Sequence, residues 1–93
     1  MLRQDQKILL VKDLNQELTQ LIGINSINYF NENNEEFVEV VTEENVLSSN
    51  LVKMYHTLNL AGLICTEKQD DIELEDSNNK FIKYVDVYYF KFI

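Results

Sequence analysis

The chain has 93 residues, of which 45% are hydrophobic and one is cysteine, and its formal net charge at pH 7 is −8. This length and composition predict a single packed domain over residues 1–93, and they exclude an internal disulfide and an apolar span of the ~18 residues that cross a membrane. Phosphate backbones and anionic membranes repel an acidic chain, so we expect no membrane contact and no ordinary nucleic-acid binding. Residues 1–14 lack a signal-peptide core and cleavage site, so a cytoplasmic location is expected.

The first half of the sequence predicts a helix followed by a β-hairpin. Residues 4–22 place apolar side chains at helical spacing on one face, and Gly23 provides a C-terminal stop. Residues 24–41 then have strand composition on both sides of residues 31–35, which are a run of turn formers.

A second helix is expected over residues 43–60. Thr42 is the expected N-cap, and Glu43 and Glu44 suit the positive end of the helix dipole. The helix is weakest at Ser49 and its polar neighbours, because these side chains compete for backbone hydrogen bonds. The alternative is a helix that breaks there, with Ser49 as the cap of a second piece.

Strands dominate the sequence beyond Gly62, which ends the second helix. Residues 63–66 and 71–75 are short strand candidates, residues 76–79 form a turn, and residues 81–93 are a long strand candidate. A straight strand of that length would span about 43 Å, so a bend or bulge is expected. The predicted fold is a small α+β domain of order α-β-β-α-β-β, or with one more strand, in which an antiparallel sheet packs against two helices.

The sequence contains no pattern of catalytic or metal-binding residues. Nucleophilic catalysis would need Cys65 and His56, but neither lies in a nucleophile motif. The alternating acids Asp71, Glu73 and Glu75 lack the turn glycine of a calcium loop, and zinc needs more Cys and His ligands than the chain contains. We therefore expect a protein that is not an enzyme and that holds no cofactor or metal.

Acidic residues concentrate in two blocks and form the predicted partner-binding surface. Residues 31–52 contain six acids and no base, and residues 70–80 contain five acids and one lysine. Regularly spaced anions on a strand resemble a phosphate backbone and would attract a basic site on a partner protein. The alternative is a solvated acidic face that only keeps the chain soluble. The predicted binding residues are Glu32, Glu35, Glu36, Glu39, Glu43, Glu44, Asp70, Asp71, Glu73, Glu75 and Asp76.

The last strand candidate, residues 81–93, is largely apolar on both faces. It is either central in the sheet and covered twice, or it offers one face to a partner or to a second copy of the chain in a homodimer. The aromatic interface candidates are Tyr84, Tyr88, Tyr89 and Phe90.

Residues 51–64 read Leu-Val-Lys-Met-Tyr-His-Thr-Leu-Asn-Leu-Ala-Gly-Leu-Ile. This segment resembles the junction between the recognition helix and the wing of winged-helix proteins, where a helix ends in Ala-Gly-Leu-Ile and continues into a β-hairpin. The resemblance implies a wing in the strands that follow. Lys53 and His56 are the only basic groups of this helix and the implied wing is acidic, so such a chain would contact protein rather than DNA.

These features together favour a non-enzymatic acidic protein-binding module. Small phage and mobile-element inhibitors, including anti-CRISPR and anti-restriction proteins, use acidic surfaces to dock on basic nucleic-acid-binding sites of host proteins, and the analogy rests on size and charge. The alternatives are a winged-helix-like regulatory protein and an oligomeric structural or interaction subunit.

Overall fold

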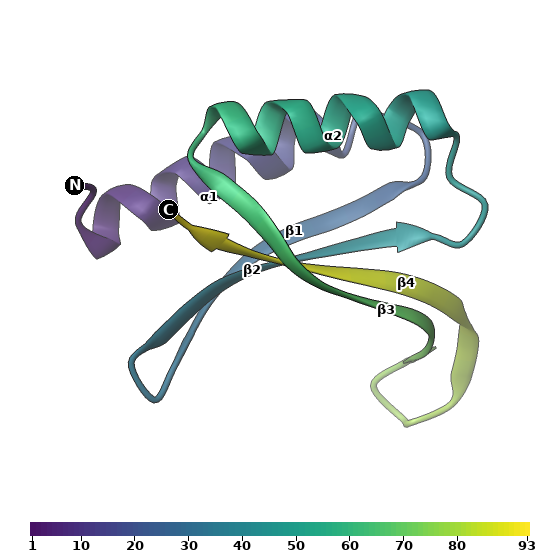
Figure 1. Cartoon of the computed structure of the whole chain (residues 1–93). Coiled ribbons are helices and arrows are strands. Elements are labelled where there is room, and N and C mark those ends of the chain that lie inside the picture. The colour runs from purple at the N-terminus through teal and green to yellow at the C-terminus, as the bar shows by residue number, and fades with distance from the viewer.

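The structure is a computed structural model that describes residues 1–93 and contains two helices and four strands in the predicted order. The elements are α1 (Gln4–Leu18), β1 (Ile24–Glu32), β2 (Glu35–Glu43), α2 (Ser48–Leu60), β3 (Leu63–Glu75) and β4 (Phe81–Phe92). Figure 1 shows both helices on one face of a twisted antiparallel sheet, whereas no helix covers the opposite face. The predicted α+β fold is confirmed, and the sheet contains no further strand.

The strand order β1-β2-β4-β3 places β4 in the interior of the sheet. One edge of β4 pairs with β2, from Val38 opposite Phe90 to Glu43 opposite Val85, and its other edge pairs with β3. β4 is therefore central, as one of the two alternatives for residues 81–93 expected, but helices cover only one of its faces, so its second apolar face is not covered by a further layer.

The hydrophobic core lies between the helices and the sheet face beneath them. α1 packs mainly against β1, and α2 packs mainly against β3. Alternate strand residues point toward the helices because successive side chains of a strand face opposite sides of the sheet. The core residues are Val11, Leu14, Leu18, Ile24, Ile27, Val38, Val40, Met54, Leu58, Leu63, Tyr88 and Phe90.

Both predicted turns are present and follow from the conformational freedom of asparagine. Asn33 and Asn34 have φ angles of 52° and 65° and join β1 to β2 as a two-residue connection, the arrangement that matches the twist of the strands it joins. In the second turn, the Asp76 carboxylate accepts hydrogen bonds from the backbone N–H groups of Asn78 (2.8 Å) and Lys80 (3.0 Å). Asparagine thus replaces glycine and proline in these turns.

Two helix boundaries differ from the prediction. α1 ends at Leu18 rather than at residue 22, and a turn then leads to Gly23. α2 begins at Ser48, with Leu47 as its N-cap, so the predicted N-cap role of Thr42 is wrong. Only the piece expected after a break near Ser49 is helical, and its cap is not Ser49. Thr42 is instead fully buried within β2, because the β-branched residues before it continue the strand and pair with β4 through Glu43.

The two strand candidates before residue 76 form the single strand β3. Its register against β4 shifts between Cys65 and Glu67, between Gln69 and Ile72, and near Leu74. Extra residues of this kind bend a strand and increase its twist, which is how the long β3–β4 hairpin curves away from the helices in Figure 1. The irregularity expected from the length of residues 81–93 is therefore present in this hairpin.

Neither helix has an apolar stretch long enough to cross a bilayer.

Candidate functional site

The sheet face without helices, here called the open face, brings together residues from all four strands. Across its middle runs one row of paired residues, in which Asn28 of β1 lies opposite Glu39 of β2, Glu39 opposite Tyr89 of β4, and Tyr89 opposite Glu67 of β3. Tyr89 therefore lies between two glutamates on neighbouring strands. The residues that define the open face are Ser26, Asn28, Phe30, Phe37, Glu39, Val41, Glu67, Gln69, Val87 and Tyr89.

Three aromatic rings are in contact on the open face. The Phe30 and Phe37 rings are stacked with centroids 5.4 Å apart, and Phe37 meets Tyr89 edge to face at 5.8 Å. All three side chains are half-buried. A contiguous aromatic surface of this kind offers contact area to a partner, because rigid rings gain contact at a low cost in conformational entropy.

The carboxylates beside these rings are poorly compensated. Burial raises the pKa of Glu39, which makes neither a side-chain hydrogen bond nor an ion pair. Burial also raises the pKa of the Tyr89 hydroxyl, and the negative charges of Glu39 and Glu67 raise it further. Around Tyr89 the local field therefore favours a positive group.

A hollow of about 550 Å³ lies on the open face beside Tyr89. Phe37 and Tyr89 form its apolar part, whereas Glu35 and Glu67 contribute negative charge and Lys91 a positive charge. The complete set of residues around it is Glu35, Phe37, Thr66, Glu67, Gln69, Tyr89 and Lys91. Its size and its combination of apolar and charged side chains suit a long side chain of a partner rather than a buried small-molecule ligand.

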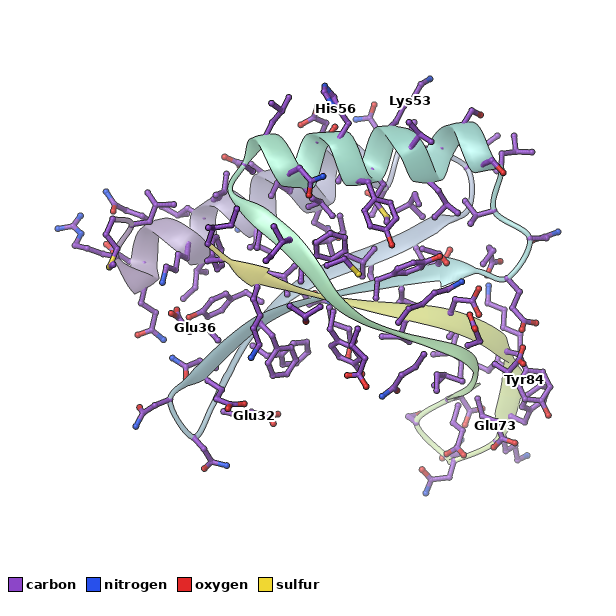
Figure 2. All side chains as sticks on the ribbon, in the orientation of Figure 1. Glu32, Glu36, Lys53, His56, Glu73 and Tyr84 are labelled. Atoms are coloured by element: carbon purple, nitrogen blue, oxygen red, sulfur yellow. The ribbon has the colours of Figure 1, made fainter.

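The predicted acidic residues do not form one continuous surface. Glu32 and Glu35 lie at the β1–β2 turn, whereas Glu73, Glu75 and Asp76 lie at the end of the β3–β4 hairpin. Figure 2 shows Glu32 and Glu73 at the far ends of the two hairpins, on opposite sides of the sheet. The open face lies between these two acidic ends.

Three predicted acids are paired with lysines. Glu36 binds Lys7 at 2.7 Å, Glu43 binds Lys83 at 2.7 Å, and Asp70 binds Lys68 at 3.0 Å. The other eight have no ion-pair partner; they are Glu32, Glu35, Glu39, Glu44, Asp71, Glu73, Glu75 and Asp76.

A separate carboxylate cluster forms where the loop before α2 meets β3 and β4. One carboxylate oxygen from each of Glu44, Asp71 and Asp86 lies within 4.8 Å of the others, and Asp86 is buried. Asp71, with a φ angle of 56°, donates its backbone N–H to Asp86 at 3.3 Å. A hydrogen bond shared with Asp71, partial burial and the neighbouring negative charges raise the pKa of Glu44. The cluster replaces the predicted regular row of Asp71, Glu73 and Glu75.

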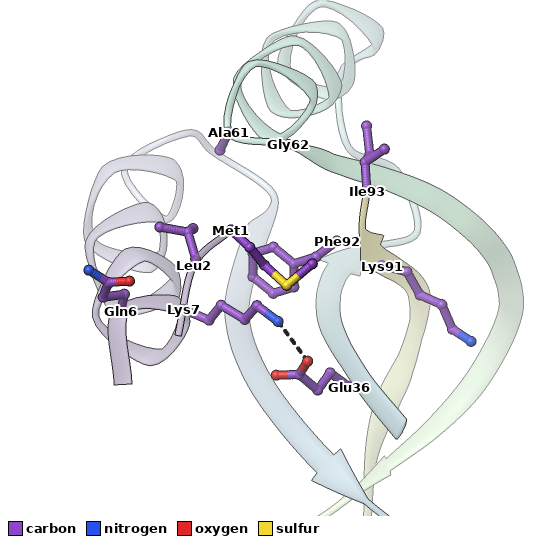
Figure 3. Close-up of a pocket in the computed structure, with 10 residues that line it drawn as sticks. All are labelled: Met1, Leu2, Gln6, Lys7, Glu36, Ala61, Gly62, Lys91, Phe92 and Ile93. Carbon is purple, nitrogen blue, oxygen red and sulfur yellow. Dashed lines mark hydrogen bonds and ion pairs between the residues drawn. The ribbon is translucent and has the colours of Figure 1, made fainter. Parts of the chain in front are cut away.

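The largest cavity, about 790 Å³, opens where the start of α1 meets the end of β4. Figure 3 shows Lys7 and Glu36 pointing toward each other within it, beneath Met1 and beside Phe92. The Lys7 ammonium lies 5.2 Å from the centre of the Phe92 ring, and the Tyr29 hydroxyl donates to the second oxygen of Glu36. These charged groups satisfy one another, so this cavity presents mostly apolar walls to a ligand.

The predicted interface aromatics have different positions. Tyr88 and Phe90 point toward the helices and are buried core residues, because they alternate with the open-face residues along β4. They are therefore not available to a partner. Tyr89 lies on the open face, and Tyr84 is exposed near the end of the β3–β4 hairpin, where Figure 2 shows it. Because both edges of β4 are paired, a second copy of the chain has no free backbone edge there.

Cys65 and His56 do not form a catalytic pair. The Cys65 thiol lies 3.7 Å from the Tyr55 hydroxyl on the helix side of the sheet, whereas Figure 2 shows His56 and Lys53 pointing away from the sheet on α2. The helix-to-hairpin junction at Gly62 is present, but the element before α2 is the strand β2. No preceding helix therefore completes a helix-turn-helix.

Glu67 and Asp86 are the site residues that the sequence did not reveal. Glu67 falls between the two predicted strands, and Asp86 lies within an apolar strand, so neither belongs to an acidic block. The pairing of β3 with β4 is the only signal that places Glu67 beside Tyr89.

A comparison of the chain with protein-family models found no match, and comparisons with curated proteins and with solved structures likewise found none.

Proposed function

We propose that this protein is a non-enzymatic acidic module that binds a basic surface of a partner protein through the open face of its sheet. The observation that carries the proposal is the pair Glu39 and Glu67, which flank the half-buried ring of Tyr89 without a cationic partner. The half-buried charge of Glu39 is unfavourable without a paired cation, so a basic partner would supply the missing compensation, and the exposed Glu67 would add to its attraction.

The acidic hairpin ends extend this surface. Glu32 and Glu35 flank the open face on one side, and Glu73 and Glu75 lie on the other. Negative groups around an apolar centre attract a basic surface over a distance and speed its docking. A basic nucleic-acid-binding site is the partner surface with the complementary charge, and its occupation would inhibit that partner in the manner of a nucleic-acid mimic.

The proposal is tested by removing charge from the open face. The variant Glu35→Gln, Glu39→Gln, Glu67→Gln changes the net charge by three units, and its residues make no ion pairs that hold the fold together. We expect this face variant to lose the proteins that the native chain captures from a cell lysate. High salt and added duplex DNA or RNA should release the same proteins from the native chain, because both compete for the basic site.

A matched control separates the position of the charge from its amount. The variant Asp5→Asn, Asp13→Asn, Glu17→Gln removes the same charge from exposed positions of α1. The proposal requires this α1 variant to capture the same proteins as the native chain. Equal loss of capture by both variants would mean that only the overall charge matters, and equal retention would mean that the open face binds nothing.

A further inference from the structure

We propose that the hollow beside Tyr89 is a receptor for one arginine side chain from a basic segment of the partner protein. The inference rests on the proposed function and adds the chemical identity of the group that is bound. Aromatic rings and carboxylates without cations meet at this one place on the open face, and each contributes a separate interaction with a guanidinium group.

The rings supply the first interaction. Phe37 and Tyr89 touch edge to face at 5.8 Å, and both line the hollow. A guanidinium plane that stacks on a ring of this pair would gain the attraction between a cation and an aromatic face. Phe30, stacked on Phe37, extends the apolar surface along which the methylene stem of the side chain would lie.

The glutamates supply the second interaction. Glu67 of β3 and Glu35 of β2 line the hollow, whereas Glu39, opposite Tyr89 on β2, lies outside its lining and adds only its charge. A cation in the hollow therefore lies near carboxylates from two strands. A guanidinium has five N–H donors in a fixed plane and can donate to carboxylates on two sides, whereas an ammonium acts as a point charge. The arrangement therefore favours arginine over lysine.

A second copy of this chain is not the expected occupant. Arg3 is the only arginine, it lies in the N-terminal segment, and it is already 3.5 Å from Asp5. Two copies with a net charge of −8 each would also repel one another. Lys91, at the rim of the hollow, opposes the approach of a cation and limits the affinity for a free arginine, so a longer basic segment is required.

The test measures binding of fluorescent oligoarginine and oligolysine peptides of equal length at physiological salt. The native protein should bind oligoarginine several-fold more tightly than oligolysine. Glu67→Gln should weaken oligoarginine binding about fivefold to tenfold, in keeping with the loss of a charge-assisted contact. Glu73→Gln removes the same charge at the hairpin end, away from the hollow, and should change the affinity less than about twofold.

Two further variants distinguish a ring contact from simple charge attraction. Tyr89→Leu should abolish the preference for arginine while it leaves binding of oligolysine nearly unchanged, and Tyr89→Phe should retain the preference. Equal affinity for the two peptides, or equal effects of Glu67→Gln and Glu73→Gln, would overturn the arginine site. Tight binding of a single-stranded oligonucleotide to the native chain would overturn it as well.

The arginine receptor and the acidic docking surface can fail separately. If the peptides show no preference but the face variant still loses its captured proteins while the α1 variant keeps them, the arginine receptor is wrong and the acidic docking surface stands. If the peptides show no preference and the face variant also captures the same proteins as the α1 variant, both proposals are wrong.

Discussion

Glu36 and Glu44 experience opposite electrostatic environments although both belong to the same acidic block. Hydrogen bonds from Lys7 and Tyr29 lower the pKa of Glu36 below its usual value of 4.5. The pKa of Glu44 is raised above the same value, first by the hydrogen bond shared with Asp71 and then by burial and negative neighbours. Ionised Glu36 therefore stabilises the folded state, whereas ionised Glu44 destabilises it.

Neutralising these two residues should change stability in opposite directions. We expect Glu44→Gln to raise the melting temperature at pH 7 and Glu36→Gln to lower it. A carboxyl whose pKa is lowered by folding stabilises the folded state above its unfolded-state pKa, and this stabilisation is lost as the pH falls through its folded-state pKa. A carboxyl whose pKa is raised by folding destabilises the folded state at neutral pH, and this cost disappears once the group is protonated. Both differences from the native protein should therefore shrink in thermal melts at about pH 3. Shifts of the same sign at pH 7 would contradict the assigned environments.

The open-face residues show how much of the site a sequence can reveal. Alternation along residues 81–93 already separates Tyr89 from Tyr88, and the acidic block already contains Glu39. The contact of Tyr89 with Glu39 and Glu67 depends on a register between strands that lie far apart in the chain. No local pattern fixes such a register, so the composition of the site was predictable only in part.

At the scale of the elements, the two glycines end the helical regions as predicted, but their surroundings differ. Gly23 and Gly62 have φ angles of 94° and 90°, which side chains other than glycine adopt only with strain. A Cβ at Gly23 would also lie 2.7 Å from a methyl carbon of Val46, whereas a Cβ at Gly62 would meet no atom within 4 Å.

Replacing the two glycines should therefore have unequal costs. Gly62→Ala should destabilise by about 1 kcal/mol, the conformational cost of a left-handed alanine. Gly23→Ala adds a clash with Val46 and should cost about 3 kcal/mol in denaturant unfolding. Equal losses in the two variants would contradict the tight contact between the segment after α1 and the loop before α2.

The start of α2 shows why element boundaries were less predictable than element types. Glu43 and Glu44 suit a helix N-terminus, and this local preference led to a start at residue 43. In the structure, Glu43 instead pairs with Val85 and binds Lys83, so β2 continues and the helix begins at Ser48. Pairing with a strand some 40 residues away outweighed the local preference, and only the folded sheet contains that information.

At the scale of the whole molecule, the two faces of the sheet have different roles. One face carries the hydrophobic core beneath α1 and α2, and the other carries the aromatic and acidic residues of the open face (Figure 1). Because the core residues and the open-face residues alternate along the same strands, side chains such as Glu67 can change without loss of the packed interior. The separation makes the open face a surface on which binding can be tested without unfolding the protein.

The most direct test of this account is an NMR titration of the labelled native protein with the oligoarginine peptide. We predict that the amide signals with the largest shifts belong to Glu39, Glu67 and Tyr89 and to their neighbours on the open face. Shifts confined to α1, or to the hairpin ends at residues 32–34 and 75–79, would contradict the claim that the open face is the binding surface.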